Sequence, residues 1–365
     1  MLSGRRARLL PVVAIATAAA VAAVPPATAA GGGGSSVPVV TKGLDGPYGL
    51  SRAPGHRGLV VAEGDTGQVT RVLMNGKQRT ILDGATGVAG VAASPARVFA
   101  VTGGGDETGP GGSGKYAPAK VVRMDYRGRH VKVIADLMRY ELRHNPDGQK
   151  QFVNGQPVDA LSNPFSMTWS RFGLFVADGG ANDVLRINPR TGHVSTFFVP
   201  PTVKDVKACK SPEAQANPGT KGCDPVPTGV QVKKGSLYVS TLGAEAPGAG
   251  RIYKLNARNG KVQRVWKGFT APTGVAVRKD GTIYFSEVLQ GLPATEQPPP
   301  GFDPSTVGQI TRIRHGRVRH AQVTMPTGLA LKGGHLYATA WSVAGLFLGV
   351  PDAGQVVRVR DRAFH

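Results

Sequence analysis

Cysteine and acidic residues are both scarce in this chain. Its 365 residues include 2 Cys, and 23 Asp and Glu stand against 44 Lys and Arg, which gives a formal net charge of +21. The two cysteines, Cys209 and Cys223, are too far apart for a CxxC redox pair and too few for a metal site. In an oxidising compartment we expect them to form a disulfide that closes a polar loop containing Pro and Gly.

Familiar catalytic motifs are missing as well. The sequence has no GxSxG nucleophile elbow, and its histidines fall mostly in turns or strands without an evident Ser or acid partner. Nucleophilic catalysis therefore finds no support in the motifs. Long apolar runs are also missing after residue 24, so no membrane span is expected in the mature protein.

The N-terminus has the pattern of a secretory signal peptide. Three arginines precede an apolar, Ala-rich run at residues 9–24, and Ala-Thr-Ala follows at 27–29. We expect a signal peptide at 1–29, a flexible Gly/Ser linker at 30–36, and a secreted, extracytoplasmic protein. A membrane anchor is disfavoured because the run is short and ends in two prolines.

The rest of the chain repeats one pattern. A short alternating apolar run follows an opening that contains Pro or Gly, a tight turn leads to a second run, and a third run has the form apolar-x-basic-apolar. The openings occur six times, at Pro47, Val88, Pro164, Pro227, Pro272 and Pro326. With a fourth strand in each repeat, the sequence predicts an all-β, six-bladed β-propeller of four-stranded antiparallel blades.

The two ends of the chain predict how the ring closes. The sixth repeat stops after its third strand, whereas an extra strand-like run at 37–44 precedes the first repeat. We expect this N-terminal strand to complete the last blade, so that 37–365 form a single propeller domain without an open edge. Five openings carry Gly at one position and the other carries Ser166, as expected for strands that crowd round a central axis.

The basic residues suggest one class of partner and argue against another. Six of them recur in the third strand of each repeat, where their stems are expected to pack along blade faces. The densest basic group, at 312–320, alternates between the two faces of one hairpin, so no nucleic acid is expected. A cationic exported protein is expected to meet anionic cell-wall polymers instead.

Long connections in the predicted propeller belong to two types. They join second to third strands, or one blade's fourth strand to the next blade's first, and these two types emerge on the same side of the disc. The remaining turns are tight. One face is therefore predicted to be elaborated, and binding usually resides in such loops on a rigid scaffold.

Three carboxylates end second strands on that face: Glu63, Asp178 and Glu287. If they converge, they could hold Ca²⁺ or another divalent cation at the channel mouth. The alternative is that each accepts backbone N–H bonds in its own loop or pairs with a third-strand arginine. No metal motif of fixed spacing decides between the two interpretations.

The densest polar run is RYELRHNPDG at 139–148, followed by SNPF at 162–165 and ADGGANDVLRI at 177–187. In this order the segments resemble the ScyD/ScyE family of exported propellers, named from scytonemin pigment biosynthesis. The chain departs from the family by a displaced Gly in the third segment and by STLGAEAPG at 240–248. The resemblance covers nearly the whole mature chain and implies a six-bladed extracytoplasmic propeller, without an activity that can be carried over.

We therefore expect a secreted binding or scaffolding module. Its predicted ligand site is where six side chains of these segments come together: Tyr140, Glu141, Asn145, Asp147, Asn163 and Asp178. The ligand could be a small molecule, a glycan or a protein, and the competing interpretation is that these residues only fix a long loop. The alternative function is a metal-dependent hydrolase or lyase of the gluconolactonase type, with Asp45 and Asn163 as two of several ligands.

Overall fold

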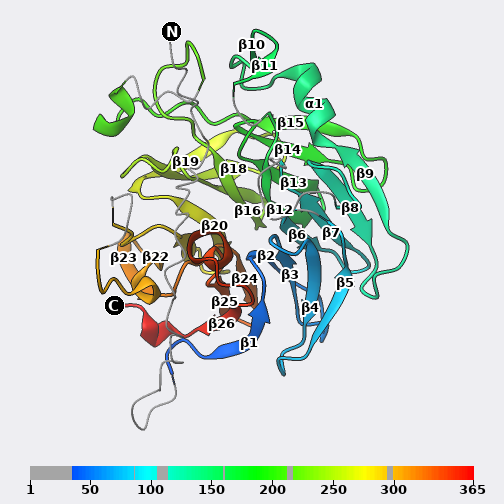
Figure 1. The fold of residues 1–365 in the computed structure, drawn as a ribbon, viewed down its shortest axis with the longest axis vertical. Coiled ribbons are helices and arrows are strands. Elements are labelled where there is room, and N and C mark those ends of the chain that lie inside the picture. Colours follow the sequence, from blue (N-terminus) through cyan, green and yellow to red (C-terminus); the bar gives the residue numbers. More distant parts are fainter. Residues whose placement is uncertain (1–34, 86, 105–113, 159–160, 212–216, 294–298) are drawn as a thin grey trace.

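The computed structural model describes residues 35–85, 87–104, 114–158, 161–211, 217–293 and 299–365. The predicted signal peptide and most of the predicted linker lie outside the described residues. Within these ranges the chain forms six four-stranded antiparallel sheets and one two-stranded hairpin. The sheets surround a common axis (Figure 1), which confirms the predicted six-bladed β-propeller.

Each of the first five blades is an up-and-down meander whose strands follow chain order. Blade one is β2 (Pro47–Arg52), β3 (Leu59–Glu63), β4 (Gln68–Val72) and β5 (Gln78–Leu82). Blade two is β6 (Val88–Ala93), β7 (Val98–Thr102), β8 (Lys120–Met124) and β9 (Lys132–Asp136). Blade three is β12 (Pro164–Ser170), β13 (Gly173–Asp178), β14 (Asp183–Ile187) and β15 (Val194–Phe198).

The remaining blades follow the same plan. Blade four is β16 (Pro227–Lys233), β17 (Ser236–Thr241), β18 (Gly250–Asn256) and β19 (Val262–Phe269). Blade five is β20 (Pro272–Val277), β21 (Ile283–Glu287), β22 (Gln309–Arg314) and β23 (Arg317–Gln322). Blade six is β24 (Leu329–Lys332), β25 (His335–Ala340), β26 (Gly354–Val359) and, from the N-terminal end, β1 (Val39–Leu44).

Pairing of β1 with β26 closes the ring, as predicted. The strands run antiparallel, with Val39 opposite Val357 and Leu44 opposite Gly354. Leu44 is fully buried in a cluster with residues of blades one and six, including Leu59. The N-terminal strand therefore joins the first and last blades through side-chain packing as well as through backbone hydrogen bonds.

Glycines on the inner strands permit the close approach of neighbouring blades. A Cβ added to Gly274 of β20 would lie 2.1 Å from the carbonyl oxygen of Thr327 next to blade six. At Gly229 of β16 it would lie 2.2 Å from the carbonyl oxygen of Thr273 in blade five. The small residues predicted to face the axis are therefore required by contact between adjacent backbones.

The 137–163 insertion contains a helix that the sequence interpretation treated as loop. Helix α1 (Leu137–His144) begins at Asp136, whose side chain accepts the backbone N–H of Arg139, and ends at Asn145 in the left-handed conformation. Leu137 is fully buried against blades two and three. The hairpin of β10 (Phe152–Val153) and β11 (Gln156–Pro157) follows in the same insertion.

Other helices are short. Among the described residues they are α2 (Ala344–Leu348) and the single turns η1 (Lys207–Lys210), η3 (Pro304–Thr306) and η4 (Asp361–Ala363). Across the described ranges, every helix is too short or too polar to cross a membrane.

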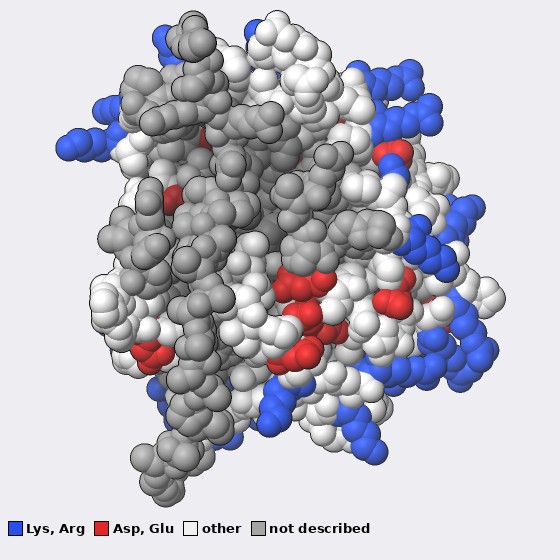
Figure 2. Space-filling model, in the orientation of Figure 1, with Lys and Arg blue, Asp and Glu red and all other residues white. Residues whose placement is uncertain are grey.

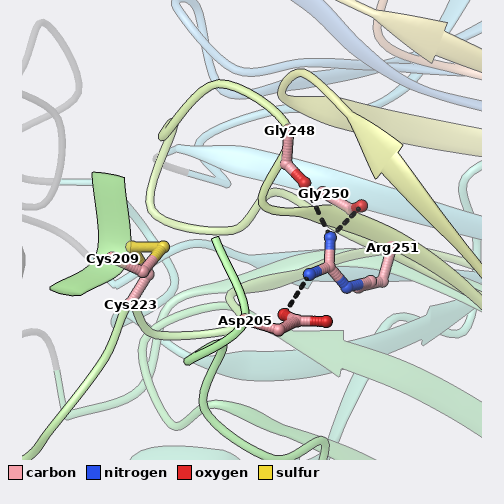
Figure 3. Close-up of a disulfide and its surroundings, with 6 residues drawn as sticks. All are labelled: Asp205, Cys209, Cys223, Gly248, Gly250 and Arg251. Atoms are coloured by element: carbon pink, nitrogen blue, oxygen red, sulfur yellow. Dashed lines mark hydrogen bonds and ion pairs between the residues drawn. A yellow bond between two sulfur atoms is a disulfide. The ribbon is translucent and has the colours of Figure 1, made fainter. Parts of the chain in front are cut away.

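Cys209 and Cys223 form the predicted disulfide, with their Cα atoms 5.0 Å apart (Figure 3). Near it, the buried guanidinium of Arg251 in β18 donates to Asp205 at 2.7 Å, and Lys267 in β19 donates to the other carboxylate oxygen at 2.8 Å. These contacts attach the long connection between blades three and four to blade four.

Candidate functional site

Asp178, at the end of β13, is fully buried and well supplied with donors. The hydroxyl of Ser162 donates to Oδ2 at 2.6 Å, and the backbone N–H groups of Asn163 and Ala181 donate to Oδ1 at 2.7 and 3.2 Å. Burial raises the pKa of Asp178 to about 6 although these hydrogen bonds oppose the rise. The carboxylate therefore fixes both the entry to β12 and the turn into β14.

Asp183 lies directly opposite Asp178, at the start of β14. It is 0% exposed, and neither of its carboxylate oxygens has a hydrogen-bond partner. Burial, together with the charges of Asp178, Glu141 and Asp147, raises the pKa of Asp183 well above its usual value. The sequence interpretation did not include Asp183 among the site residues.

Helix α1 contributes Glu141, which is also buried. Its Oε1 accepts from Nε2 of Gln151 at 2.8 Å, whereas Oε2 has no partner. Burial, followed by the charges of Asp178 and Asp147, raises the pKa of Glu141 to about 8. The helix therefore places a carboxyl group beside the two of blade three.

The Asn-Pro-Asp-Gly turn after α1 contributes Asp147. Its Oδ1 accepts the backbone N–H of Gln149 at 2.9 Å, and its Oδ2 accepts from Nδ2 of Asn182 at 3.2 Å. Asn145 donates to the Gln149 carbonyl at 2.9 Å, but its own Oδ1 is buried without a partner. Burial raises the pKa of Asp147.

Gln149 connects this turn to the disulfide loop. Its Nε2 donates to Asp224, and its Oε1 accepts from Asn217 at 2.9 Å and from Thr220 at 2.7 Å. Asp224 is fully buried, its second oxygen has no partner, and burial raises its pKa. Asp224, like Asp183, was missed by the sequence interpretation.

We call these side chains the blade-three acid cluster: Glu141, Asp147, Asp178, Asp183 and Asp224. No ion pair among the described residues involves any of the five. Five carboxyl groups therefore lie together, mostly buried, without a cationic side chain to offset them. Burial of ionised carboxylates is costly under these conditions unless protons or another cation compensate.

The six residues predicted to share a ligand site are only partly brought together. Asn145 lies in the turn that carries Asp147, beside the cluster. Tyr140 instead bonds to Thr196 of β15, accepting its backbone N–H at 2.8 Å, and stacks on His144 at 4.2 Å. Asn163 Oδ1 accepts the backbone N–H of Gly104 at 2.8 Å.

The second predicted set, Glu63, Asp178 and Glu287, does not converge. Glu63 accepts the backbone N–H of Asp45 at 2.9 Å, and Glu287 accepts from Gln309 at 2.8 Å and from Thr311. Each of the three carboxylates also accepts at least one backbone N–H, which for Glu287 is that of Thr270 at 3.2 Å. In the described parts of the chain, no three His, Cys, Asp or Glu side chains are placed to hold a metal ion as they stand.

A second concentration of acids lies at blades one and six, and we call it the blade-one acid group: Asp45, Glu63, Asp65 and Asp352. Tyr48 donates its hydroxyl to Asp65 at 3.0 Å, and Asp352 donates its backbone N–H to Asp45 at 3.4 Å. Burial raises the pKa of Glu63 and of Asp65, and the charge of Asp45 adds to both effects. Figure 2 shows acidic side chains near the middle of one face of the molecule, with basic side chains around its rim.

The central channel contains a cavity of about 330 Å³ lined by inner strands of the blades. The rings of Tyr48 and Phe165, from blades one and three, approach to 6.3 Å between centroids. Asp45 and Asn163, the two candidate ligands of a gluconolactonase-type site, bond to different backbone groups, as described above. Each side chain therefore already has a backbone donor of its own.

No family model and no curated protein matches this chain in sequence. Solved structures with a similar fold include a gluconolactonase of Xanthomonas campestris (12% identity, TM-score 0.52, 88% of this chain and 89% of the other). They also include a luciferin-regenerating enzyme (11% identity, TM-score 0.54, 88% of this chain and 94% of the other). A third is the PQQ-bound aldose sugar dehydrogenase of Streptomyces coelicolor (15% identity, TM-score 0.52, 88% of this chain and 97% of the other). At these identities the similarity establishes the propeller fold alone.

Proposed function

We propose that this chain is an exported binding propeller of the ScyD/ScyE type, which holds its ligand on the elaborated loop face. The observation that carries the proposal is the concentration of acids on loops of that face in a protein whose formal net charge is +21. The acids of the blade-three acid cluster and of the blade-one acid group lie in connections between second and third strands or between blades, or at the strand ends next to them. The disulfide supports export, because such bonds persist in oxidising compartments.

The chemistry of the face favours a cationic, hydroxylated ligand. Carboxylates near the mouth of the channel attract positive charge and accept hydrogen bonds from hydroxyl groups. In the blade-one acid group, Asp352 is exposed and Asp45 is half-buried, so ligands from solvent can reach both. Asp65 is half-buried with its Oδ2 out of contact with solvent, so it acts on a ligand through its charge. The basic rim seen in Figure 2 would serve a separate purpose, retention in an anionic cell-wall polymer.

The proposal can be tested with a glucosamine hexamer, which is both cationic and hydroxylated, and with the neutral N-acetylglucosamine hexamer for comparison. Isothermal titration calorimetry should show tighter binding of the cationic hexamer, and its affinity should fall as salt is added. Asp65→Asn should weaken binding, because it removes charge from the blade-one acid group. Asp280→Asn, in a tight turn on the plain face, is the matched control and should bind as the parent does.

Two results would contradict the proposal. One is equal binding of the two hexamers at low salt, which would show that the acids do not select for charge. The other is an equal loss of affinity in Asp65→Asn and Asp280→Asn, which would place the interaction elsewhere on the molecule.

A further inference from the structure

Blade three differs from blades one and five at one cross-strand pair, formed by the last residue of the second strand and the first residue of the third. In those two blades the position pairs a glutamate with a glutamine: Glu63 with Gln68, and Glu287 with Gln309. The amide of Gln309 donates to Glu287 at 2.8 Å, so that pair satisfies itself. In blade three the pair is Asp178 with Asp183. Directly opposed residues have Cβ atoms about 5 Å apart, so two carboxylates meet where the other blades place an acceptor and a donor.

Asp183 cannot be explained as a structural hydrogen-bond acceptor. Its carboxylate is fully buried and neither oxygen has a partner. Asp178, opposite it, already accepts from one hydroxyl and two backbone N–H groups, so both of its oxygens have donors of their own. Glu141 adds a further buried oxygen without a partner. A structural acid would be expected to have donors, as Glu287 does.

The unpartnered atoms in and beside the blade-three acid cluster are all of one chemical kind. Carboxylate oxygens of Glu141, Asp183 and Asp224 and amide oxygens of Asn145 and Asn217 are buried without hydrogen bonds. Hard divalent cations of the Ca²⁺ type bind carboxylate and amide oxygens, six to eight at a time. The atoms that need a partner are therefore those that such an ion would take.

We propose that the blade-three acid cluster is a binding site for a divalent cation of the Ca²⁺ class, with Asp183, Glu141 and Asp147 as its carboxylate ligands. The three side chains come from β14, α1 and the turn after α1, so the ion joins the 137–163 insertion to blade three. This site lies beside the middle strands of blade three, and none of its three proposed ligands belongs to the set of Glu63, Asp178 and Glu287. It does not depend on the proposed binding of a ligand at the blade-one acid group.

Ion binding includes a rearrangement of side chains. As they stand, no three acidic side chains within the described ranges are placed to hold a metal ion. Asp147 Oδ2 accepts from Asn182 at 3.2 Å, so it has to leave this donor to bind the ion. Rotation about side-chain bonds closes the ligand shell, while β13, β14 and α1 keep their backbone positions.

The test uses the full mature chain, treated with EDTA and dialysed, then titrated with Ca²⁺ by calorimetry and with Tb³⁺ by luminescence. Ca²⁺ at a hundredfold excess over its Kd should raise the melting temperature by about 4 °C. Asp183→Asn should abolish the response. Without Ca²⁺ this variant should melt at or above the parent's temperature, because its amide can donate to Asp178 as Gln309 does to Glu287.

Glu287→Gln is the matched control, since it changes the buried acid of the equivalent cross-strand pair in blade five, at the place of Asp178, and this acid already has donors. It should keep the Ca²⁺ response whatever its own stability. Should Asp183→Asn fail to fold, Glu141→Gln takes its place with the same expectation. The proposal is overturned if the parent shows neither Ca²⁺ binding nor a change in melting temperature, which would mean that protons neutralise the cluster. It is also overturned if the response survives in Asp183→Asn.

Discussion

Truncation of Leu44 to alanine tests the closure of the ring. Leu44 is fully buried at the end of β1, in a cluster that includes Leu59 of blade one and Tyr337 of blade six. Removing a buried leucine side chain costs about 3 kcal/mol, from lost transfer free energy and the remaining cavity. In a domain of this size that loss lowers the melting temperature by about 4 °C. Differential scanning calorimetry measures the shift directly.

Val39 supplies the control within the same strand. It pairs with Val357 in the ladder, but its side chain is 53% exposed. Val39→Ala should therefore change stability by less than about 0.5 kcal/mol. If Leu44→Ala and Val39→Ala shift the melting temperature equally, or if neither does, β1 does not close the propeller by packing between blades one and six.

Three further predictions follow from the fold. Gly274→Ala should lower the free energy of unfolding by about 2 kcal/mol, because the added Cβ would meet the backbone next to blade six. Ser166→Ala, at the corresponding place in blade three, should be tolerated, and equal melting temperatures of the two variants would contradict this prediction. Replacing Cys209 and its partner by serine should cost about 3 kcal/mol in urea denaturation, and an unchanged midpoint would show that the loop unfolds separately. Lys267 and Arg251 lower the pKa of Asp205 to about 2, so this pairing stabilises the protein above about pH 4 and the contribution is lost as pH falls towards 2. Because the side chain of Asp205 is 52% exposed, Asp205→Asn should cost less than about 1 kcal/mol at pH 6, with a smaller difference at pH 3; a constant difference would refute the assignment.

The architecture was predictable because each blade repeats the same physical requirements. Alternating apolar runs, tight turns and a small residue on the inner strand recur six times, so a weak signal in one repeat is reinforced by the others. The sixth repeat lacks a fourth strand and the run at 37–44 belongs to no repeat, so pairing of the two was predicted to close the ring. β1 begins two residues later than predicted, at Val39, although Pro38 still accepts a hydrogen bond from Arg358.

Helix α1 was missed because it is short. Eight residues give little more than two turns, too few for a helical period to stand out from the polar run in which it lies. The signals that were present are its caps, Asp136 at the start and Asn145 at the end. The helix directs Tyr140 and Glu141 to different neighbours, which is why consecutive residues of the motif do not share a site.

Asp183 could have been found from the sequence by comparing repeats. Gln68 and Gln309 begin the third strands of blades one and five, and aligning them with blade three places Asp183 at the same position, opposite Asp178. Asp224 could not have been found in this way. It reaches the cluster through Gln149, across a contact between two insertions that are far apart in the sequence.

Hydrogen–deuterium exchange with and without the glucosamine hexamer tests the central claim most directly, because it locates binding on the molecule. We predict slower exchange in the elaborated loops of blades one and six, around residues 63–68 and 341–353. The tight turns of the opposite face, such as 279–281 and 332–334, should exchange at the same rate in both samples. Protection confined to those turns, or spread evenly over both faces, would contradict the assignment of binding to the elaborated face.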